Sequence, residues 1–517
     1  MKSKLLKRIG ALAVAMTLVF ANGVLATAAP GTATNGNAGQ IATDGNAGQN
    51  QNKPGNQNQP EKDPDEWDTI YGNGYYMEAG TKTDAGYIAW IFNDSTLKKA
   101  NVNTAISEAL KDSHVIKESW LCFSVPDGVS VNKENLSVMK EKSMRLTANS
   151  DIARWDFSKV INAATDFNTD DIKVGNINDK AKAKLVNSNI TSYIPLTISG
   201  IGSLPGNAYV SLKVADNISV CGDAYAYYYN SALDKFEYVS ESYIYAGNQQ
   251  KEAWTDISDV SKRGSYVLTR EKLPDQLTTG TVVDAWTEYS ETNKELADSA
   301  IDCIKNEANK GEIVKVFVPD GLKVSASVFK AAKDKGVKLQ IKSAASTAVW
   351  NFADFSALSD SMKDFDPTVS VGEKIQAIND ALGKLTVPAG MKSITVDFAF
   401  EGTLPGKTDV TLDLSAAGFA NNATVYLYYY NPQTKQLEKS ATGTYVDGYA
   451  TFTITHCSQY LVTDKELAGA GKDNTPATSP ASTKAPKTGD NNAVALYVVL
   501  CGLGVVVAAV AKRKRNA

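Results

Sequence analysis

Histidine and cysteine are both scarce in this chain. Its 517 residues include 2 histidines and 5 cysteines. Two histidines argue against a multi-histidine metal site and against most histidine-based catalysis. Five cysteines in a chain of this length rule out a disulfide scaffold. Two disulfides are still possible, with buried free thiols as the alternative: Cys122–Cys221 and Cys303–Cys457.

The chain also lacks an excess of basic charge and the common catalytic motifs. Its 53 Lys and Arg against 57 Asp and Glu give a net charge of −4, which excludes a broadly basic nucleic-acid binder. No phosphate-binding loop, nucleophile elbow, HExxH or CxxC is present. The acidic stretch from Asp166 starts like a calcium loop, but its sixth position is Asp171 and its twelfth is Ile177, so that pattern fails. We expect no catalytic residue, cofactor or metal.

The N-terminus has the pattern of a secretory signal peptide. Basic residues within 2–8 precede an apolar run from Ile9 to Phe20, and Ala26-Thr27-Ala28 supplies the small residues of a cleavage site. The apolar run is short for a membrane anchor. Export from the cytoplasm is therefore expected.

The C-terminus carries a second address. Ala493 to Ala511 has no charge and is long enough to cross a bilayer, and Lys512-Arg513-Lys514-Arg515 follows it. Immediately before this span stands Ala485-Pro486-Lys487-Thr488-Gly489. The arrangement resembles the L-P-x-T-G sorting signal of wall-anchored surface proteins of Gram-positive bacteria, with Ala485 in place of Leu.

That resemblance implies a sortase that cuts between Thr488 and Gly489 and joins the chain to peptidoglycan. The mature protein is then extracellular and held at the cell wall, and the C-terminal helix serves as a membrane anchor only before sorting. Loss of 1–28, with four basic residues, and of 489–517, with four basic residues and Asp490, takes the net charge from −4 to −11. Such a chain is not drawn to nucleic acid.

Most of the remaining chain is a tandem repeat. Five segments recur in the same order: FSVPDGVSV with VFVPDGLKV, ARWDFSKV with AVWNFADF, GSLPG with GTLPG, YAYYYNSALDKFEYV with YLYYYNPQTKQLEKS, and SYVLTREKL with QYLVTDKEL. A period near 195 residues indicates tandem domains instead of a solenoid. The expected organisation is a signal peptide (1–28), a disordered linker (29–65), two repeat domains (66–275 and 276–467), a Pro/Thr/Ser stalk with the sorting motif (468–488), and the membrane helix with its tail (489–517).

Local patterns predict α+β repeats with mainly antiparallel strands and a few helices. Helices are expected at 104–111 and 293–309, followed by strands at 120–125 and 313–318. A second helix in each repeat has N-cap candidates in Asn132 and Ser325, and Gly336 is placed to end the second of them. The two Leu-Pro-Gly segments are expected to form type II turns.

Alternating tyrosines are the first candidate binding residues. Tyr225, Tyr227 and Tyr229 in one repeat, and Tyr426, Tyr428 and Tyr430 in the other, share one face if each segment is a strand. An exposed trio could stack on sugar rings. The alternative is that these tyrosines pack within a half-buried sheet.

Tryptophans divide by whether they recur. Trp155 matches Trp350 and Trp90 matches Trp286, which favours core positions. Trp120 and Trp254 have no partner in the other repeat, so they are binding candidates, with satellite packing as the alternative.

These observations predict a non-enzymatic surface protein whose two modules bind an extracellular polysaccharide. Two weak sites on one chain would reinforce each other. The Tyr-rich and C-terminal strands also resemble modules of surface proteins of gut clostridia. The alternatives are a structural protein or adhesin that contacts a host or neighbouring cell surface, and a hydrolase with an unrecognised carboxylate pair.

Overall fold

The computed structural model describes residues 68–72, 75–79, 88–92, 102–111, 115–124, 128–216, 221–247 and 251–472, all within one compact unit. His114, the signal peptide, the 29–65 linker, residues 473–488 with the sorting motif, and the apolar span lie outside these residues. The expected stalk starts at 468, but Gly471–Lys472 form a strand, which corrects its first residues. Among the described residues, no helix has the length and apolar character to cross a bilayer.

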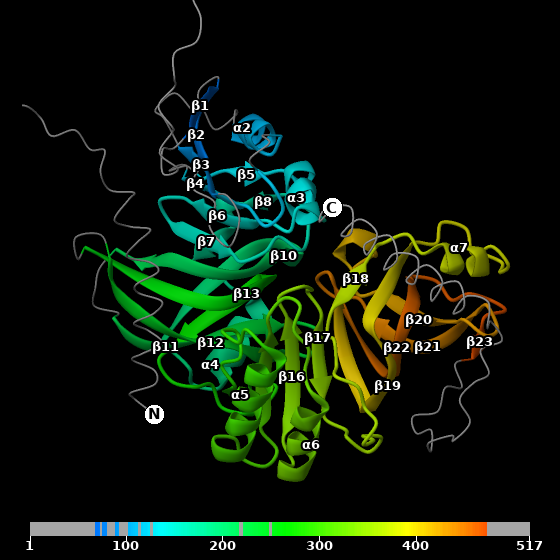
Figure 1. The fold of residues 1–517 in the computed structure, drawn as a ribbon. Helices are drawn as coiled ribbons and strands as arrows, with labels where there is room; N and C mark the ends of the chain where they lie inside the picture. Colours follow the sequence, from blue (N-terminus) through cyan, green and yellow to red (C-terminus); the bar gives the residue numbers. More distant parts are fainter. Residues whose placement is uncertain are drawn as a thin grey trace, which may run out of the picture. The chain divides into compact units, whose positions relative to one another are not determined.

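The fold is α+β, as predicted, and consists of two large sheets with short helices (Figure 1). The first sheet contains β1 (Asp68–Gly72), β2 (Tyr75–Ala79), β3 (Ile88–Phe92), β4 (Trp120–Ser124), β6 (Arg145–Asn149), β7 (Ala153–Phe157), β9 (Ile172–Val174), β10 (Tyr193–Ala215), β11 (Gly222–Asn230), β12 (Lys235–Gly247) and β13 (Glu252–Thr269). The second contains β14 (Val282–Asp284), β15 (Ile313–Val318), β16 (Lys338–Ser343), β17 (Val349–Phe352), β18 (Val369–Val371), β19 (Ser393–Asp413), β20 (Thr424–Asn431), β21 (Gln436–Thr444), β22 (Tyr449–Thr463) and β23 (Gly471–Lys472). β5 (Ser130–Val131) pairs with β8 (Phe167–Asn168).

The two sheets share one strand order. The first runs β3-β4-β6-β7-β10-β13-β11-β12 and the second β14-β15-β16-β17-β19-β22-β20-β21, with β1 and β2 added to the first and β23 to the second. In each, the first three of these strands are parallel and the rest antiparallel. The sequence did not reveal the parallel portion, although the intervening helices are the connections that parallel strands need. The repeat boundary at 275/276 stays a prediction.

The described helices are α2 (Val102–Ala109), α3 (Lys133–Glu141), α4 (Asp179–Asn187), α5 (Asn293–Asn306), α6 (Ala326–Lys335) and α7 (Gln376–Leu382). The expected caps are present: the Asn132 side chain accepts from Asn135 N, Ser325 accepts from Ser327 N, and Gly336 ends α6 at φ 72°. α5 and α6 pack together on the sheet beside β15 and β16 (Figure 1). Leu296, Ala300 and Cys303 form part of the buried stripe of α5, as expected.

The Leu-Pro-Gly segments are not turns, which corrects the prediction. Both lie inside long strands, β10 and β19, at a break in the pairing: β10 advances from Ile198 to Ala208 while β13 advances only from Gly264 to Val260. Proline has no N–H to give to a ladder, so it is tolerated in a strand at such a bulge. The Pro205 carbonyl instead accepts from Ile161 N at 2.8 Å.

Trp155 and Trp350 form the centre of each sheet's core, as predicted. Both are fully buried. Each indole Nε1 donates over 2.9 Å to a backbone carbonyl, Thr169 O in one half and Pro367 O in the other. Each ring meets a phenylalanine edge-on, Phe167 at 5.2 Å and Phe365 at 5.0 Å. Repetition of these contacts explains why both tryptophans recur in the sequence.

We expect Trp155→Ala to lower the free energy of unfolding by about 3–5 kcal/mol, because it empties a packed aromatic site and leaves the Thr169 carbonyl without its donor. Urea denaturation of the whole chain, followed by circular dichroism, measures this. Ile152→Ala, at an exposed position in the same half, should change stability by less than about 0.5 kcal/mol. Equal effects of the two changes would contradict this account of the core.

Candidate functional site

The tyrosine trios do not form an exposed ladder, which corrects that interpretation. Tyr227 and Tyr229 are each 3% exposed and Tyr428 is fully buried. They pack in two small clusters that include Ala181 and Leu185 of α4 in the first half, and Ile378 and Ala381 of α7 in the second. The sequence did not reveal these two helices, which cover the face on which the tyrosines would otherwise be exposed.

The tyrosine hydroxyls in these clusters are used within the fold. Tyr227 Oη accepts from Leu273 N at 3.0 Å, and Tyr428 Oη accepts from Leu467 N at 2.8 Å. Burial raises the pKa of Tyr227 to about 12. Tyr225, Tyr426 and Tyr430 are partly exposed at the margins of the clusters, and lysines lie over the Tyr225 and Tyr426 rings. The packed arrangement is the alternative that the sequence left open.

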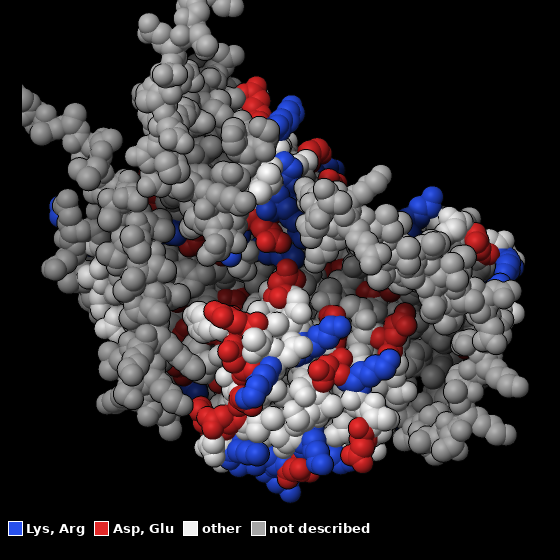
Figure 2. Space-filling model, in the orientation of Figure 1, with Lys and Arg blue, Asp and Glu red and all other residues white. Residues whose placement is uncertain are grey.

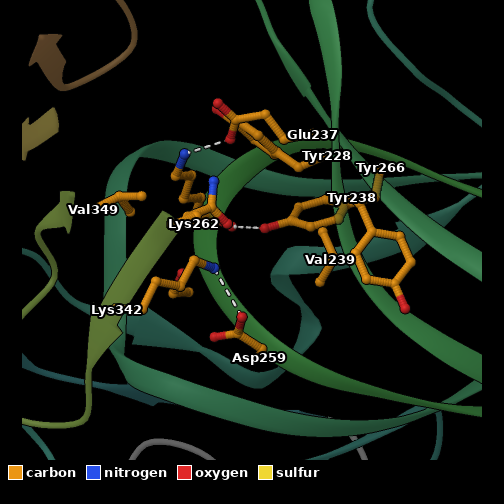
Figure 3. A pocket seen from close by; sticks show the side chains of 11 residues that line it. Tyr228, Glu237, Tyr238, Val239, Asp259, Lys262, Tyr266, Lys342 and Val349 are labelled. Atoms are coloured by element: carbon orange, nitrogen blue, oxygen red, sulfur yellow. Dashed lines mark hydrogen bonds and ion pairs between the residues drawn. The ribbon is translucent and has the colours of Figure 1, made fainter. Parts of the chain in front are cut away.

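A cavity lies where β12 and β13 meet β16 and β17 (Figure 3). Its volume is about 20 Å³, room for about one water molecule and far too small for a sugar. Its charged groups are paired: Lys262 Nζ lies 2.8 Å from Glu237, and Lys342 Nζ lies 2.8 Å from Asp259. Tyr266 Oη donates to the Lys262 carbonyl at 2.6 Å. This cavity is therefore part of the packing between the two sheets.

A better candidate is the outward face of the first sheet, opposite the Trp155 core. Along β7 the burial alternates, with Ala153, Trp155 and Phe157 inward and Arg154 and Asp156 partly exposed. Direct cross-strand pairs then place a row of polar and aromatic side chains on that outward face. We call this row the aromatic–carboxylate face: Trp120, Thr147, Arg154, Asp156, Tyr209, Ser211, Lys213, Tyr245, Glu252, Trp254 and Asp256.

One end of the aromatic–carboxylate face is organised around Asp156. Trp120 Nε1 donates to Thr147 Oγ1 at 2.9 Å, and Thr147 Oγ1 donates to Asp156 Oδ1 at 2.6 Å. Arg154 Nε lies 2.8 Å from Asp156 Oδ2. The indole and the guanidinium are thus held in place by the same carboxylate, one through a hydroxyl and one directly.

The other end is organised around Asp256 and Glu252. Asp256 Oδ1 accepts from Ser211 Oγ at 2.6 Å and from Tyr245 Oη at 3.0 Å. Glu252 accepts from Lys213 Nζ at 2.6 Å and from Trp254 Nε1 at 3.1 Å. Both aromatic side chains therefore have their polar atoms fixed by carboxylates.

Tyr209 lies between the two ends. Burial, and then the nearby carboxylates of Asp256 and Asp156, hold its pKa well above the usual range. A hydrogen bond between its hydroxyl and the Asp256 carboxylate contributes to this shift, so the Tyr209 hydroxyl is also fixed by a carboxylate. Aromatic side chains with fixed hydroxyl, guanidinium and carboxylate neighbours can stack on an apolar ring face and exchange hydrogen bonds with hydroxyls at its rim.

The structure places the two candidate tryptophans, Trp120 and Trp254, on this face, and Trp67, which also lacks a partner in the other repeat, lies outside the described residues. Sequence reasoning missed Arg154, Tyr209, Tyr245 and the two aspartates. A signal was present for some of them, since the alternating segment AYVSLKV puts Tyr209, Ser211 and Lys213 on one side of a strand. Whether this segment forms part of a site depends on which strands lie beside it, because the neighbouring residues Arg154 and Tyr245 come from distant segments of the chain.

The described residues contain no arranged site for metal binding or thiol chemistry. No cluster there of His, Cys, Asp or Glu could hold a metal ion. Asn168 caps a short 3-10 helix (Thr169–Asp171), and Asp171 pairs with Arg263 at 2.6 Å. The four cysteines in the described part are free, so neither possible disulfide is formed. The sorting residues Pro486, Lys487, Thr488 and Gly489 lie outside it.

Comparison with known proteins does not identify a family. No protein-family model matches the chain, and no curated protein does either. Structures of the CBM32-1 and CBM32-2 domains of Clostridium perfringens ZmpB, one with GalNAc, are each 11% identical, cover 57% of this chain and 86% and 88% of theirs, and give TM-scores of 0.11 and 0.09. A two-domain protein of unknown function from Bacteroides fragilis is 12% identical, covers 58% of this chain and 90% of its own, and gives a TM-score of 0.13. TM-scores this low do not establish a shared fold.

Thiol labelling tests the placement of the cysteines. Burial raises the pKa of Cys122 and of Cys303 to about 12, and it raises that of Cys457 well above the usual range, whereas Cys221 is exposed. In the native chain at pH 8 we expect an aromatic disulfide reagent to label Cys221 quickly and the other three only after denaturant is added. Peptide mass mapping identifies each labelled site. Rapid native labelling of Cys122 would contradict the burial of its side chain on β4.

Proposed function

We propose that this chain is an extracellular surface protein that is anchored to the cell wall and binds glycans through the aromatic–carboxylate face. The observation that carries the proposal is the set of four aromatic side chains on one sheet face, each beside a hydrogen-bonded carboxylate or hydroxyl. Pyranose rings present apolar C–H faces and equatorial hydroxyls, which are the two features that such a face complements.

The charge pattern supports a neutral ligand. Every carboxylate of the face already accepts from a hydroxyl, a guanidinium, an ammonium or an indole, and Lys213 is shared by Glu252 and Asp216 at 2.6 and 2.8 Å. Little net charge is left to attract an ion. On the described surface around α5 and α6, positive and negative side chains are interspersed (Figure 2). The paired charges of the aromatic–carboxylate face and the absence of a basic patch on this described surface support a neutral polysaccharide over nucleic acid as the partner.

The proposed location at the cell wall rests on sequence signals near the two termini. A signal peptide, the Pro486–Gly489 motif, an apolar span and a basic tail occur in the order that sorting requires. Together with the linkers on either side, this order supports a mature chain displayed outside the cell. A binding role without catalysis follows as part of the proposal.

A pull-down of the whole chain on starch, xylan, cellulose, mucin and peptidoglycan tests glycan binding. We expect retention on at least one of them, and Trp254→Ala should weaken it by about tenfold or more, since truncation of an aromatic anchor at a binding site costs about 2 kcal/mol. Tyr289→Ala, an exposed aromatic in the other half, is the matched control and should leave retention unchanged. If none of these polysaccharides retains the native chain, glycan binding is refuted and adhesion to a protein surface takes its place.

Cell fractionation tests the anchoring. We expect Thr488→Ala to move the chain from the wall fraction to the membrane fraction, because the bond that the sortase cuts loses its threonine. Thr483→Ala, five residues upstream, is the matched control and should leave the protein in the wall. Equal wall attachment of both variants would rule out this motif as the sorting site.

A further inference from the structure

Because the two sheets share one strand order, each residue on the outward face of the first sheet can be matched with the residue at the same position in the second sheet. The cross-strand pair Ala148 and Trp155 corresponds to the pair Ile341 and Trp350. Neighbouring positions then match directly. Cys122 corresponds to Lys315, Asn149 to Lys342, and Arg154 to Val349.

The two lysines at these matched positions are used to hold the first half of the chain. Lys315 and Lys342 Nζ both reach Asp259 Oδ2, at 2.7 and 2.8 Å, and Lys315 also donates to the Val239 carbonyl at 2.9 Å. The side chains of Lys315 and Asp259 are 4% and 9% exposed. Burial alone would raise the pKa of Asp259, but the two lysines hold it below the usual range. Asp259 is therefore an anion buried between two cations.

Asp259 is an extra residue of the first half. β13 advances from Ile257 to Val260 while its partner β10 advances only from Val210 to Ala208, so β13 bulges there, and Asp259 has φ 60°. The matching stretch of β22, from Phe452 to Ile454, keeps step with β19. A bulge redirects a side chain, and here it brings a carboxylate to the two lysines. β22 has no counterpart of this residue.

A second set of contacts joins the halves at the Leu-Pro-Gly bulge. Ser203 N donates to Asp413 Oδ2 at 2.7 Å, and Gly202 N donates to the Asp447 carbonyl at 2.9 Å. Ser203 Oγ lies 3.1 Å from Tyr449 Oη. A Cβ on Gly202 would come within 2.5 Å of Ser415, so only glycine allows this approach.

Tyr449 is the residue of the second sheet that matches Trp254 of the aromatic–carboxylate face. It opposes Asp413 in the second sheet, as Trp254 opposes Lys213 in the first. Trp254 is partly exposed on the aromatic–carboxylate face, whereas Tyr449 is buried against the first half, with Lys262 Nζ 5.4 Å from its ring centroid. On β19 and β22 the remaining outward side chains nearby are small and polar: Asp409, Thr411, Thr451 and Thr453.

We propose that the outward face of β15–β17, together with Tyr449, is a docking surface for the first half of the chain, so that the two sheets form one rigid body with a single ligand face. The docking is specific to this pair because the first sheet has cysteine and asparagine where the lysines stand and β22 has no residue like Asp259. Repetition of the domain therefore supplies a support and not a second binding site. The single ligand face rests on the proposed function; the docking does not.

Hydrogen–deuterium exchange of the whole chain in mild detergent tests the docking. We expect Asp259→Asn to speed amide exchange in 313–318, 338–343 and 236–240 by about tenfold or more, because Lys342 loses its carboxylate partner and Lys315 keeps only Asp284, at 3.5 Å. Exchange in 145–157 and 376–382, away from the contact, should change little. Lys342→Gln, which keeps the Lys315 pair, should give the same pattern with a smaller change.

Asp298→Asn is the matched control, since Asp298 forms an exposed ion pair with Lys294 on α5, and it should leave exchange unchanged. Unaltered exchange in 313–343 for both Asp259→Asn and Lys342→Gln would overturn the docking proposal, and so would a uniform rise along the chain for both. In the pull-down, a single ligand face predicts that Trp254→Ala reduces retention to background. If the variant keeps about half of the native retention, the single ligand face is refuted. If the exchange result holds and no polysaccharide is retained, the docking stands and the proposed function fails.

Discussion

One long antiparallel strand pair carries each half of this molecule, and the break in that pair determines most of what surrounds it. β10 and β13 run together from Tyr193 opposite Thr269 to Ala215 opposite Ala253, with the Leu-Pro-Gly bulge between. On one side of the bulge the pair adds β7 and the Trp155 core, and on the other it adds β9 and β11. Since proline cannot donate to the ladder, the bulge backbone is free for other contacts. Gly202 and Ser203 use it to reach the second half.

The two halves have the same internal architecture and different surfaces. Each has a tryptophan packed against phenylalanines at its centre and a tyrosine cluster that a short helix covers. These shared contacts are apolar and buried, and large aromatic side chains account for much of the energy of such cores. The differences lie on the outward faces: Lys315 and Lys342 of the second sheet contact Asp259 of the first half, whereas the matching positions of the first sheet are Cys122 and Asn149. Buried charge is costly unless it is paired, and Lys315 is paired with both Asp259 and Asp284.

The alternation of side chains along a strand and the comparison of the two repeats allowed part of the site to be predicted, whereas the identity of single residues did not. The period of two placed the tyrosine trio correctly on one face of a strand, but it could not say which face is open. That was decided by α4 and α7, two short helices that the sequence analysis did not predict. Trp120 and Trp254 became candidates because they have no counterpart in the other repeat, a signal that needs no knowledge of packing; their role in binding stays a prediction. Arg154, Asp156 and Asp256 gave no such signal, because their role comes from neighbours on other strands.

The sequence by itself determined the α+β class, the repeated elements, the helix caps and the burial of Trp155 and Trp350, since each follows from local preference or from comparison of one repeat with the other. The same comparison was wrong for Trp286, which is only partly buried, and the register matches Trp90 with Asp284. Tertiary structure alone decided the parallel strands, the passage of β10 and β19 through Leu-Pro-Gly, and the burial of the tyrosines. It also decided that Asp259 meets Lys315 and Lys342. These depend on contacts between residues far apart in the chain, and a side chain's neighbours across a sheet are set by strand order and register.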